Sequence, residues 1–411
     1  MRQLEKTKDL EFYLARGNYY DAVDFDDCVF RVHKGITEGR DAMDEYKLVL
    51  IDEYQDFNAL EAGIVDLLGD KSPIVIAGDD DQALYSQLRD ASWDHIRSLH
   101  IGGKFTVFEL PFCLRCPKVV VDAVNDVIIQ AQELRKLEGR IKKPYKYFAP
   151  AKGKDSETYP KIALVRTSVQ REKLNYMGRY IADAIRQIPK NEIEAAANGG
   201  YPAALVIAAR PYRGQIIACL REHNFPILIK EDGEDMLDRA RGLAILNEND
   251  KSNLGWRIVI EAEEKKFAAG LVAKTAEMDR PMVDVIPRKF REEILAETKQ
   301  IESVSEGNEE DRQLGETASM IKVTSFEGAK GLSAQHVFIA GLHNGEIPGD
   351  PNNVRDLEIC KFVVGLTRTR KRCYLIHTGR FGDQQKRPCL FISWIEDSRF
   401  DRIEINAGSW K

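Results

Sequence analysis

The sequence has few cysteines and no long apolar run, and these two absences exclude secreted miniproteins and membrane-spanning proteins. Its 7 cysteines are an odd number scattered over 411 residues, unlike the disulfide framework of a small secreted domain. No apolar run approaches the roughly 20 residues that a membrane-spanning helix needs. We therefore expect reduced thiols, a cytoplasmic location and no membrane partner.

An excess of positive charge is also absent. The chain has 60 Lys and Arg residues against 66 Asp and Glu residues, a formal net charge of −6. It is therefore not a polycation that coats nucleic acid through its whole surface, and any nucleic-acid site has to be a local groove. At 411 residues the chain is long enough for two or three domains with buried cores.

Short apolar segments rich in β-branched residues alternate with segments of helical periodicity. Because these segments are apolar throughout instead of alternating, they predict parallel strands covered on both faces, and hence an α/β fold class with parallel sheets flanked by helices. The predicted strands are 47–52, 73–78, 105–110, 161–166, 203–210, 226–230, 321–325, 336–342 and 373–378. Residues 24–36 and the charged stretch from Trp256 to about Met320 are expected to be helical.

Acidic residues follow two of the predicted strands directly. LVLIDEYQD (48–56) places Asp52 and Glu53 at the end of one strand, and PIVIAGDDDQALY (73–85) places Asp79–Asp81 and Gln82 at the end of the next. Ligands bind at the carboxyl ends of strands in open α/β sheets, and paired carboxylates can hold Mg²⁺ and activate a water. For Asp52 and Glu53, an acidic helix N-cap is the structural alternative. Three adjacent acids also repel one another unless a cation or a basic partner lies close.

These segments resemble motifs of the UvrD/Rep-type superfamily 1 DNA helicases. Further matches occur in the order that this family has, from about Leu48 to His377. The matching segments are DEYQD (52–56), GDDDQALY (78–85), LPFCLRCP (110–117), NDKSNLGWR (249–257), SFEGAKGLS (325–333) and VVGLTRTR (363–370).

The resemblance implies an ATP-dependent motor that moves 3′ to 5′ on single-stranded DNA and separates duplexes, with ATP and Mg²⁺ as cofactors. It implies that Asp52 and Glu53 hold the metal and that Glu53 activates the attacking water. Catalytic or nucleotide-binding roles fall to Gln82, Arg115, Gly331 and Arg368.

The expected DNA contacts are those of Lys330, Tyr85 and Trp93. Tyr85 and Trp93 stand near Gln87 and Leu88, where the family has a base-stacking aromatic residue. For Trp93 a place in the core remains an equal alternative. Single-stranded and partly duplex DNA are the expected partners, and a nuclease or other protein partner is left open.

The family's phosphate-binding loop, G-x-x-x-x-G-K-[ST], does not occur in the sequence. The resemblance therefore predicts a RecA-like fold with a partial first domain at 1–115, a second domain at 116–255 and 319–411, and a reduced helical insertion at 256–318. We expect an N-terminally truncated helicase, either a fragment or a mis-assigned start. Two alternatives stay open: another polypeptide supplies the loop, or the chain is a non-catalytic DNA-binding or regulatory subunit.

Two further features carry weaker signals. The stretch 135–154 combines many Lys and Arg residues with Tyr145, Tyr147 and Phe148, which suits either a nucleic-acid groove or a solvated linker. Cys113 and Cys116 form a lone C-x-x-C; without a second pair, buried thiols are favoured over a zinc site.

Overall fold

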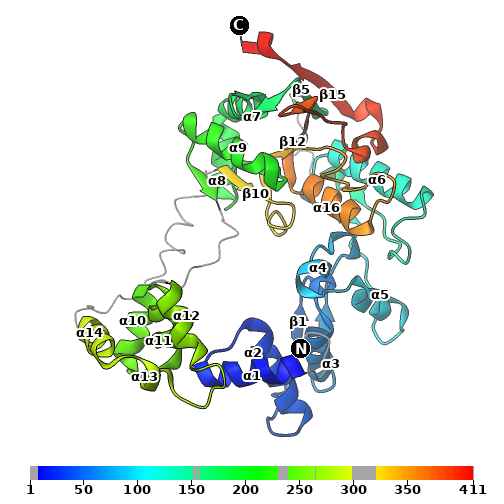
Figure 1. Ribbon diagram of the computed structural model, residues 1–411. Coiled ribbons are helices and arrows are strands. Elements are labelled where there is room, and N and C mark those ends of the chain that lie inside the picture. Colours follow the sequence, from blue (N-terminus) through cyan, green and yellow to red (C-terminus); the bar gives the residue numbers. More distant parts are fainter. Residues whose placement is uncertain are drawn as a thin grey trace. The chain divides into compact units, whose positions relative to one another are not determined.

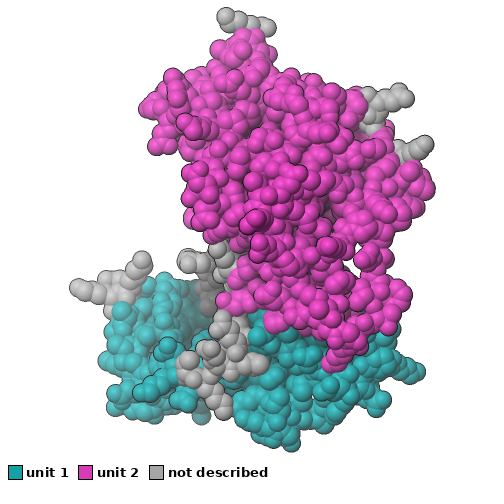
Figure 2. Space-filling view, turned by 90° about the vertical axis from the view of Figure 1, so that its right-hand side faces the viewer, with its two compact units in different colours: residues 1–50, 58–75, 231–308 teal, residues 51–57, 76–230, 309–411 magenta. Residues whose placement is uncertain are grey.

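The computed structural model describes residues 8–150, 155, 158–229, 239–263, 265–298 and 321–410 (Figure 1). By internal contacts the chain divides into two compact units, which Figure 2 colours separately. Unit 1 comprises residues 1–50, 58–75 and 231–308, and unit 2 comprises residues 51–57, 76–230 and 309–411.

The described residues of unit 1 are mainly helical. Its helices are α1 (Lys8–Tyr20), α2 (Phe25–Thr37), α3 (Ala59–Gly69), α10 (Arg239–Glu248), α11 (Asn253–Glu261), α12 (Lys265–Ala273), α13 (Met282–Val285) and α14 (Arg288–Thr298). The helix predicted at 24–36 is confirmed as α2, which starts after Asp24 because that carboxylate accepts a hydrogen bond from the Asp27 amide. The helical prediction from Trp256 onward is confirmed up to Thr298, and residues 299–320 lie outside the described part.

Two apolar clusters stabilise unit 1. The larger surrounds Trp256, which is fully buried among residues of α10 to α14 and packs with Tyr19 and Tyr20 of α1. The smaller joins Leu10, Phe30 and Leu60 from α1, α2 and α3. Each such fully buried side chain contributes about 1.5–3 kcal/mol relative to an exposed one.

The first two predicted strands form, but they are not buried on both faces. β1 (Val49–Ile51) and β2 (Ile74–Ile76) make a two-stranded sheet. Leu50 is 71% exposed and Val75 is 53% exposed, so the expectation of buried strands is wrong here. The physical reason is size: two strands of three residues offer too little surface for a layer of helices to cover.

Unit 2 contains a seven-stranded sheet in the order β15-β5-β12-β11-β8-β10-β9. Every neighbouring pair in it is parallel, which confirms the α/β fold class with a parallel sheet flanked by helices, an arrangement consistent with a RecA-like domain. The strands are β5 (Ile162–Thr167), β8 (Ala204–Ala208), β9 (Ile227–Ile229), β10 (Ile321–Thr324), β11 (Ala334–Ala340), β12 (Thr369–Thr378) and β15 (Phe400–Ile405).

Alternate residues of these strands enter two separate cores, as the period of two in a strand requires. Leu205 and Ile207 of β8 pack with α6 (Lys118–Glu133) and α16 (Asp356–Thr367). Val206 of the same strand packs on the other face with α7 (Tyr176–Arg186) and α9 (Arg210–Glu222). This double cover explains why β8 is apolar throughout (Figure 1).

The remaining elements of unit 2 are short, apart from α5 and α8. They are η1 (Tyr54–Asp56), η2 (Asp80–Gln82), α4 (Ser86–Arg89), α5 (Trp93–Ile101), β3 (Phe112–Cys113), β4 (Lys146–Tyr147), β6 (Gln170–Arg171), β7 (Leu174–Asn175), α8 (Lys190–Asn198), β13 (Arg380–Phe381), β14 (Gln384–Gln385), η4 (Leu390–Trp394), η5 (Asp397–Arg399) and η6 (Ala407–Trp410).

The strand predicted at 105–110 is not present in the described structure. Phe108 is 84% exposed and Leu110 is 94% exposed, and no neighbouring strand pairs with this segment. A strand needs a hydrogen-bonding partner, so its apolar sequence alone does not make it one. Among the described helices, none has both the length and the apolar character to span a bilayer.

Candidate active site

The turns that follow β1 and β2 lie side by side within unit 2. The Ile51 carbonyl accepts a hydrogen bond from the Ala77 amide at 2.8 Å, and the Ala77 carbonyl accepts one from the Tyr54 amide at 3.0 Å. Gly78 permits this approach, because a Cβ there would lie 2.6 Å from Gln55 Oε1. That same oxygen accepts a hydrogen bond from the Asp79 amide at 2.9 Å. Gln55 thus joins the two acidic turns.

Asp52 and Glu53 are both exposed at the end of β1. The Asp52 carboxylate accepts a hydrogen bond from the Glu53 amide at 2.8 Å. Glu53 has a left-handed backbone (φ 53°, ψ 36°), a conformation that costs a non-glycine residue energy and is found at functional sites. Its side chain is 54% exposed. Two adjacent carboxylates open to solvent fit the water-mediated binding of Mg²⁺.

Lys330 lies against these turns in unit 2. Its side chain is 5% exposed, and its ammonium pairs with the Asp56 carboxylate and donates to the Gln82 carbonyl at 2.7 Å. It lies 3.6 Å from Glu53 Oε2. Burial raises the pKa of Asp56, and Lys330 opposes that rise. The predicted contact of Lys330 with DNA stays a prediction; in this structure its ammonium neutralises a buried acid.

Gly331, the next residue, has a φ of +76°. That left-handed conformation suits glycine and turns the chain directly after Lys330.

Arg368 follows α16 and is 2% exposed. Its guanidinium donates to the Gln82 side-chain oxygen at 2.9 Å and to the Val364 carbonyl at 2.9 Å. Burial lowers the pKa of Arg368 to about 10, and the nearby charge of Arg115 adds to this effect. Arg368 therefore remains charged at neutral pH. Gln82 in turn donates to Asp79 at 2.7 Å, so one side chain connects the second acidic turn to Arg368.

Arg115 approaches the same region of unit 2. Its guanidinium donates to the Thr367 carbonyl at 3.2 Å, one residue before Arg368. Arg115 and Gln82 both line a cavity of about 330 Å³, together with Asp79, Leu110, Phe112, Cys113, Leu114, Arg140, Lys143, Pro144, Tyr145 and Thr367. The structure therefore brings both predicted arginines close to Gln82. Arg115 lines the same cavity as Gln82, and Arg368 donates a hydrogen bond to the Gln82 side chain.

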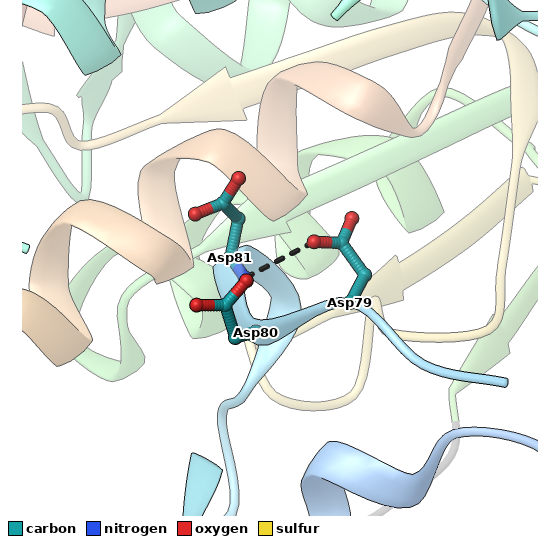
Figure 3. Close-up of side chains that lie close together, drawn as sticks. All are labelled: Asp79, Asp80 and Asp81. Carbon is teal, nitrogen blue, oxygen red and sulfur yellow. Dashed lines mark hydrogen bonds between the residues drawn. The ribbon is translucent and has the colours of Figure 1, made fainter. Parts of the chain in front are cut away.

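Asp79, Asp80 and Asp81 lie close together, with an Asp79 oxygen accepting from the Asp81 amide (Figure 3). Arg97 pairs with Asp80 at 2.9 Å, and the Lys143 ammonium lies 2.8 Å from Asp79 and also contacts Asp80. Burial raises the pKa of Asp80, but the Lys143 charge and hydrogen bonds outweigh this and leave it below the ordinary value.

Arg140 completes the cluster, with two nitrogens that donate to the two Asp81 oxygens at 2.6 Å each. Three cationic side chains therefore already neutralise the three acids, and the cluster does not fit a metal site.

The two aromatic residues predicted to stack on DNA differ in their surroundings. Tyr85 donates its hydroxyl to the Glu327 carbonyl at 3.3 Å, and the Lys330 ammonium lies 5.4 Å from its ring centroid. Trp93 begins α5, is half-buried, and has the Arg97 guanidinium 5.2 Å from its ring centroid. Each ring has a cation beside it, and their stacking on DNA stays a prediction.

Residues outside the predicted set hold the site together. Asp56 pairs with Lys330, while Arg140 and Lys143, together with Arg97, neutralise the three aspartates. The repulsion expected among adjacent acids signalled that cations had to lie nearby, but the sequence did not say which ones. Arg140 and Lys143 come from the basic stretch at 135–154, so part of that stretch faces the acids.

One protein-family model matches part of the chain. Residues 3–100 match the UvrD/REP helicase N-terminal domain, which confirms the predicted resemblance over that segment. No curated protein matches the chain. Among solved structures, the C-terminal domain of a possible DNA helicase from Lactobacillus plantarum WCFS1 is 9% identical, covering 70% of this chain and 97% of that one. Its TM-score of 0.31 is too low to establish a shared fold.

Proposed function

We propose, from the match of residues 3–100 to the UvrD/REP helicase N-terminal domain, that this chain acts in an ATP-dependent DNA helicase. The proposal includes movement 3′ to 5′ along single-stranded DNA and separation of duplexes. Its domain scheme is the one that the motifs imply: a partial first RecA-like domain at 1–115, a second at 116–255 and 319–411, and an insertion at 256–318.

One observation carries this proposal. Side chains from four separate sequence segments meet within unit 2: Glu53, Gln82, Lys330 and Arg368. Lys330 contacts the first two segments, and Arg368 donates to Gln82 across 286 residues of sequence. Such a convergence of acids, an amide and two cations is what phosphoryl transfer requires, because its catalysis is mainly positioning and charge stabilisation.

The roles that we propose for the residues of the site follow from the solvent exposure of their side chains. Asp52 and Glu53 are the exposed acids, so they would hold Mg²⁺, which when bound screens phosphate charge. Glu53 would also accept the proton of the attacking water. Arg115 and Arg368 would stabilise the negative charge that develops on the phosphate oxygens. Gln82 would report the state of the phosphate, since it already connects Arg368 to Asp79.

DNA would be held through its phosphates and by stacking of bases on Tyr85 or Trp93. Binding of this kind is sensitive to salt and shows little sequence preference. Lys330 would contribute through the Tyr85 ring that it adjoins, in addition to any direct phosphate contact.

The rival proposal is a non-catalytic DNA-binding or regulatory subunit. The absence of G-x-x-x-x-G-K-[ST] from the 411 residues favours it. The strained, exposed Glu53 and the hydrogen bond between Gln82 and Arg368 favour catalysis, because a scaffold with no chemistry to perform has no need of them.

The test is Mg²⁺-dependent ATP hydrolysis by the chain, measured with and without single-stranded DNA. In the protein completed by a phosphate-binding loop, supplied in the same or another polypeptide, we expect DNA-stimulated turnover that Glu53→Gln abolishes, with ATP binding retained. The control is Glu172→Gln, an exposed acid of the same unit, which should leave turnover unchanged. DNA binding without any turnover, in a protein that has the phosphate-binding loop, would support the non-catalytic rival instead.

A further inference from the structure

Cys113 and Cys116 are three residues apart, and a tyrosine hydroxyl and a backbone amide both donate hydrogen bonds to the Cys113 sulfur. The Tyr145 hydroxyl donates to Cys113 Sγ at 3.2 Å, and the Cys116 amide donates to it at 3.4 Å. The Cys116 thiol donates to the Thr367 carbonyl at 3.4 Å. Donors of this kind stabilise a thiolate, which is the reactive form of cysteine.

The two sulfurs also differ in accessibility. Cys113 is partly exposed and lines the cavity that contains Arg115, whereas Cys116 is fully buried. An oxidant entering the cavity would therefore meet Cys113 first. Cys116, three residues later, lies behind it.

We propose that Cys113 and Cys116 form a reversible redox site, in which a hydroperoxide oxidises Cys113 and Cys116 closes a disulfide. The Cys113 thiolate attacks one peroxide oxygen, breaking the O–O bond and leaving a sulfenic acid while the other oxygen departs as water or an alcohol. The Cys116 sulfur then attacks the Cys113 sulfur and displaces water. Two thiols lose two electrons and two protons, and the peroxide takes them up.

The surroundings of the cysteines favour oxidation at Cys113 over Cys219, Cys373 and Cys389. The hydrogen bonds from Cys116 and Tyr145 lower the pKa of Cys113 to about 5, against the effect of burial. Burial instead raises the pKa of Cys219 to about 11, and of Cys373 and Cys389 to about 12. At neutral pH only the Cys113 site favours the thiolate among these four.

Oxidation would reach the candidate active site, a consequence that rests on the proposed function. Arg115 lies between the two cysteines, and its guanidinium shares the Thr367 carbonyl with the Cys116 thiol. A disulfide between Cys113 and Cys116 removes that thiol donor and constrains the backbone around Arg115. We therefore expect the oxidised protein to hydrolyse ATP more slowly than the reduced one, by roughly a hundredfold, the low end of the loss typical of one charge-stabilising donor.

The test of the site itself does not depend on hydrolysis. The 411-residue protein is treated with hydrogen peroxide, alkylated, digested with trypsin and analysed by mass spectrometry. Trypsin cleaves after Lys104, Arg115 and Lys118, so a disulfide joins peptides 105–115 and 116–118 and lowers their summed mass by two hydrogens. We expect these joined peptides as the first product, removed by a dithiol reductant. First oxidation at Cys28, or over-oxidation of Cys113 with Cys116 still a free thiol, would overturn the proposal.

Three variants separate chemistry from folding. In Cys116→Ser the Cys113 sulfenic acid cannot be resolved, so dimedone should label it. Tyr145→Phe removes one donor, and alkylation of Cys113 at mildly acidic pH should slow by roughly threefold to tenfold. Cys28→Ser should change neither result. Failure to find the joined peptides refutes the redox site, whereas joined peptides with unchanged hydrolysis refute only its link to the proposed function.

Discussion

Replacing Lys330 by methionine tests whether its buried ammonium is the charge that neutralises Asp56. The Lys330 side chain is 5% exposed and the Asp56 side chain is 12% exposed. The other Asp56 oxygen, Oδ1, is buried with no hydrogen-bond partner among the described residues. Removing one partner of a buried ion pair costs about 3–5 kcal/mol in the free energy of unfolding. Because Asp56 can take up a proton instead, we expect Lys330→Met to cost about 3 kcal/mol near neutral pH.

The pH dependence gives this prediction a sign. Burial already raises the pKa of Asp56, and without Lys330 the pKa rises further. An acid whose pKa is raised by folding destabilises the folded state above that pKa and has no such effect below its unfolded value. The loss caused by Lys330→Met should therefore be large at about pH 8 and smaller at about pH 5.

The assay is urea unfolding of the protein and of each variant, followed by circular dichroism at both pH values. Lys118→Met is the matched control, because Lys118 pairs with Asp122 at 2.6 Å but is 61% exposed; it should cost no more than about 1 kcal/mol. Adding Asp56→Asn to Lys330→Met should restore part of the stability, since no carboxylate is then left unpaired. Equal losses in Lys330→Met and Lys118→Met, or a loss that does not change with pH, would refute the reasoning.

Two further predictions concern Arg368 and the aromatic residues. Arg368→Ala should stop ATP hydrolysis and leave single-stranded DNA binding nearly intact. Arg368→Lys should keep the charge but lose the hydrogen bond to Gln82, and hydrolysis should stay impaired. A loss confined to DNA binding would contradict the assigned role. Of Tyr85→Ala and Trp93→Ala, the variant that removes the stacking ring should weaken single-stranded DNA binding by about 1–3 kcal/mol in a fluorescence anisotropy titration. Unchanged affinity in both variants would show that neither ring stacks on a base.

The sequence was sufficient to predict most strands of the sheet in unit 2, because their buried segments are apolar throughout. The edge strand β15 was not predicted, because its middle residues are mostly polar and are not buried. The predicted segments at 203–210 and 336–342 coincide with β8 and much of β11, whose residues are all buried. The segment 105–110 has the same composition, yet Phe108 and Leu110 are exposed and no strand forms. An apolar composition indicates that a segment could be a buried strand. Whether a partner strand lies beside it depends on the tertiary structure.

The candidate site shows the same limit. Its acids could be predicted from the ends of the first two strands, because that position depends on local sequence. Their partners could not: Lys143 reaches Asp80 across 63 residues, and Lys330 reaches Asp56 across 274. Pairings at such separations depend on how the chain folds back. Part of the basic stretch at 135–154, which suggested a nucleic-acid groove or a linker, neutralises acids of the chain itself.

Directional movement along DNA tests the central claim, an ATP-driven motor, most directly. Single-stranded DNA carrying streptavidin on a biotin at one end is incubated with ATP, Mg²⁺ and the chain completed by a phosphate-binding loop. Release of streptavidin is followed in the presence of free biotin. We predict ATP-dependent release from the 5′ end, slow release from the 3′ end, and no release by the Glu53→Gln variant. DNA binding with no ATP-dependent release from either end would contradict the account, and faster release from the 3′ end would contradict its direction.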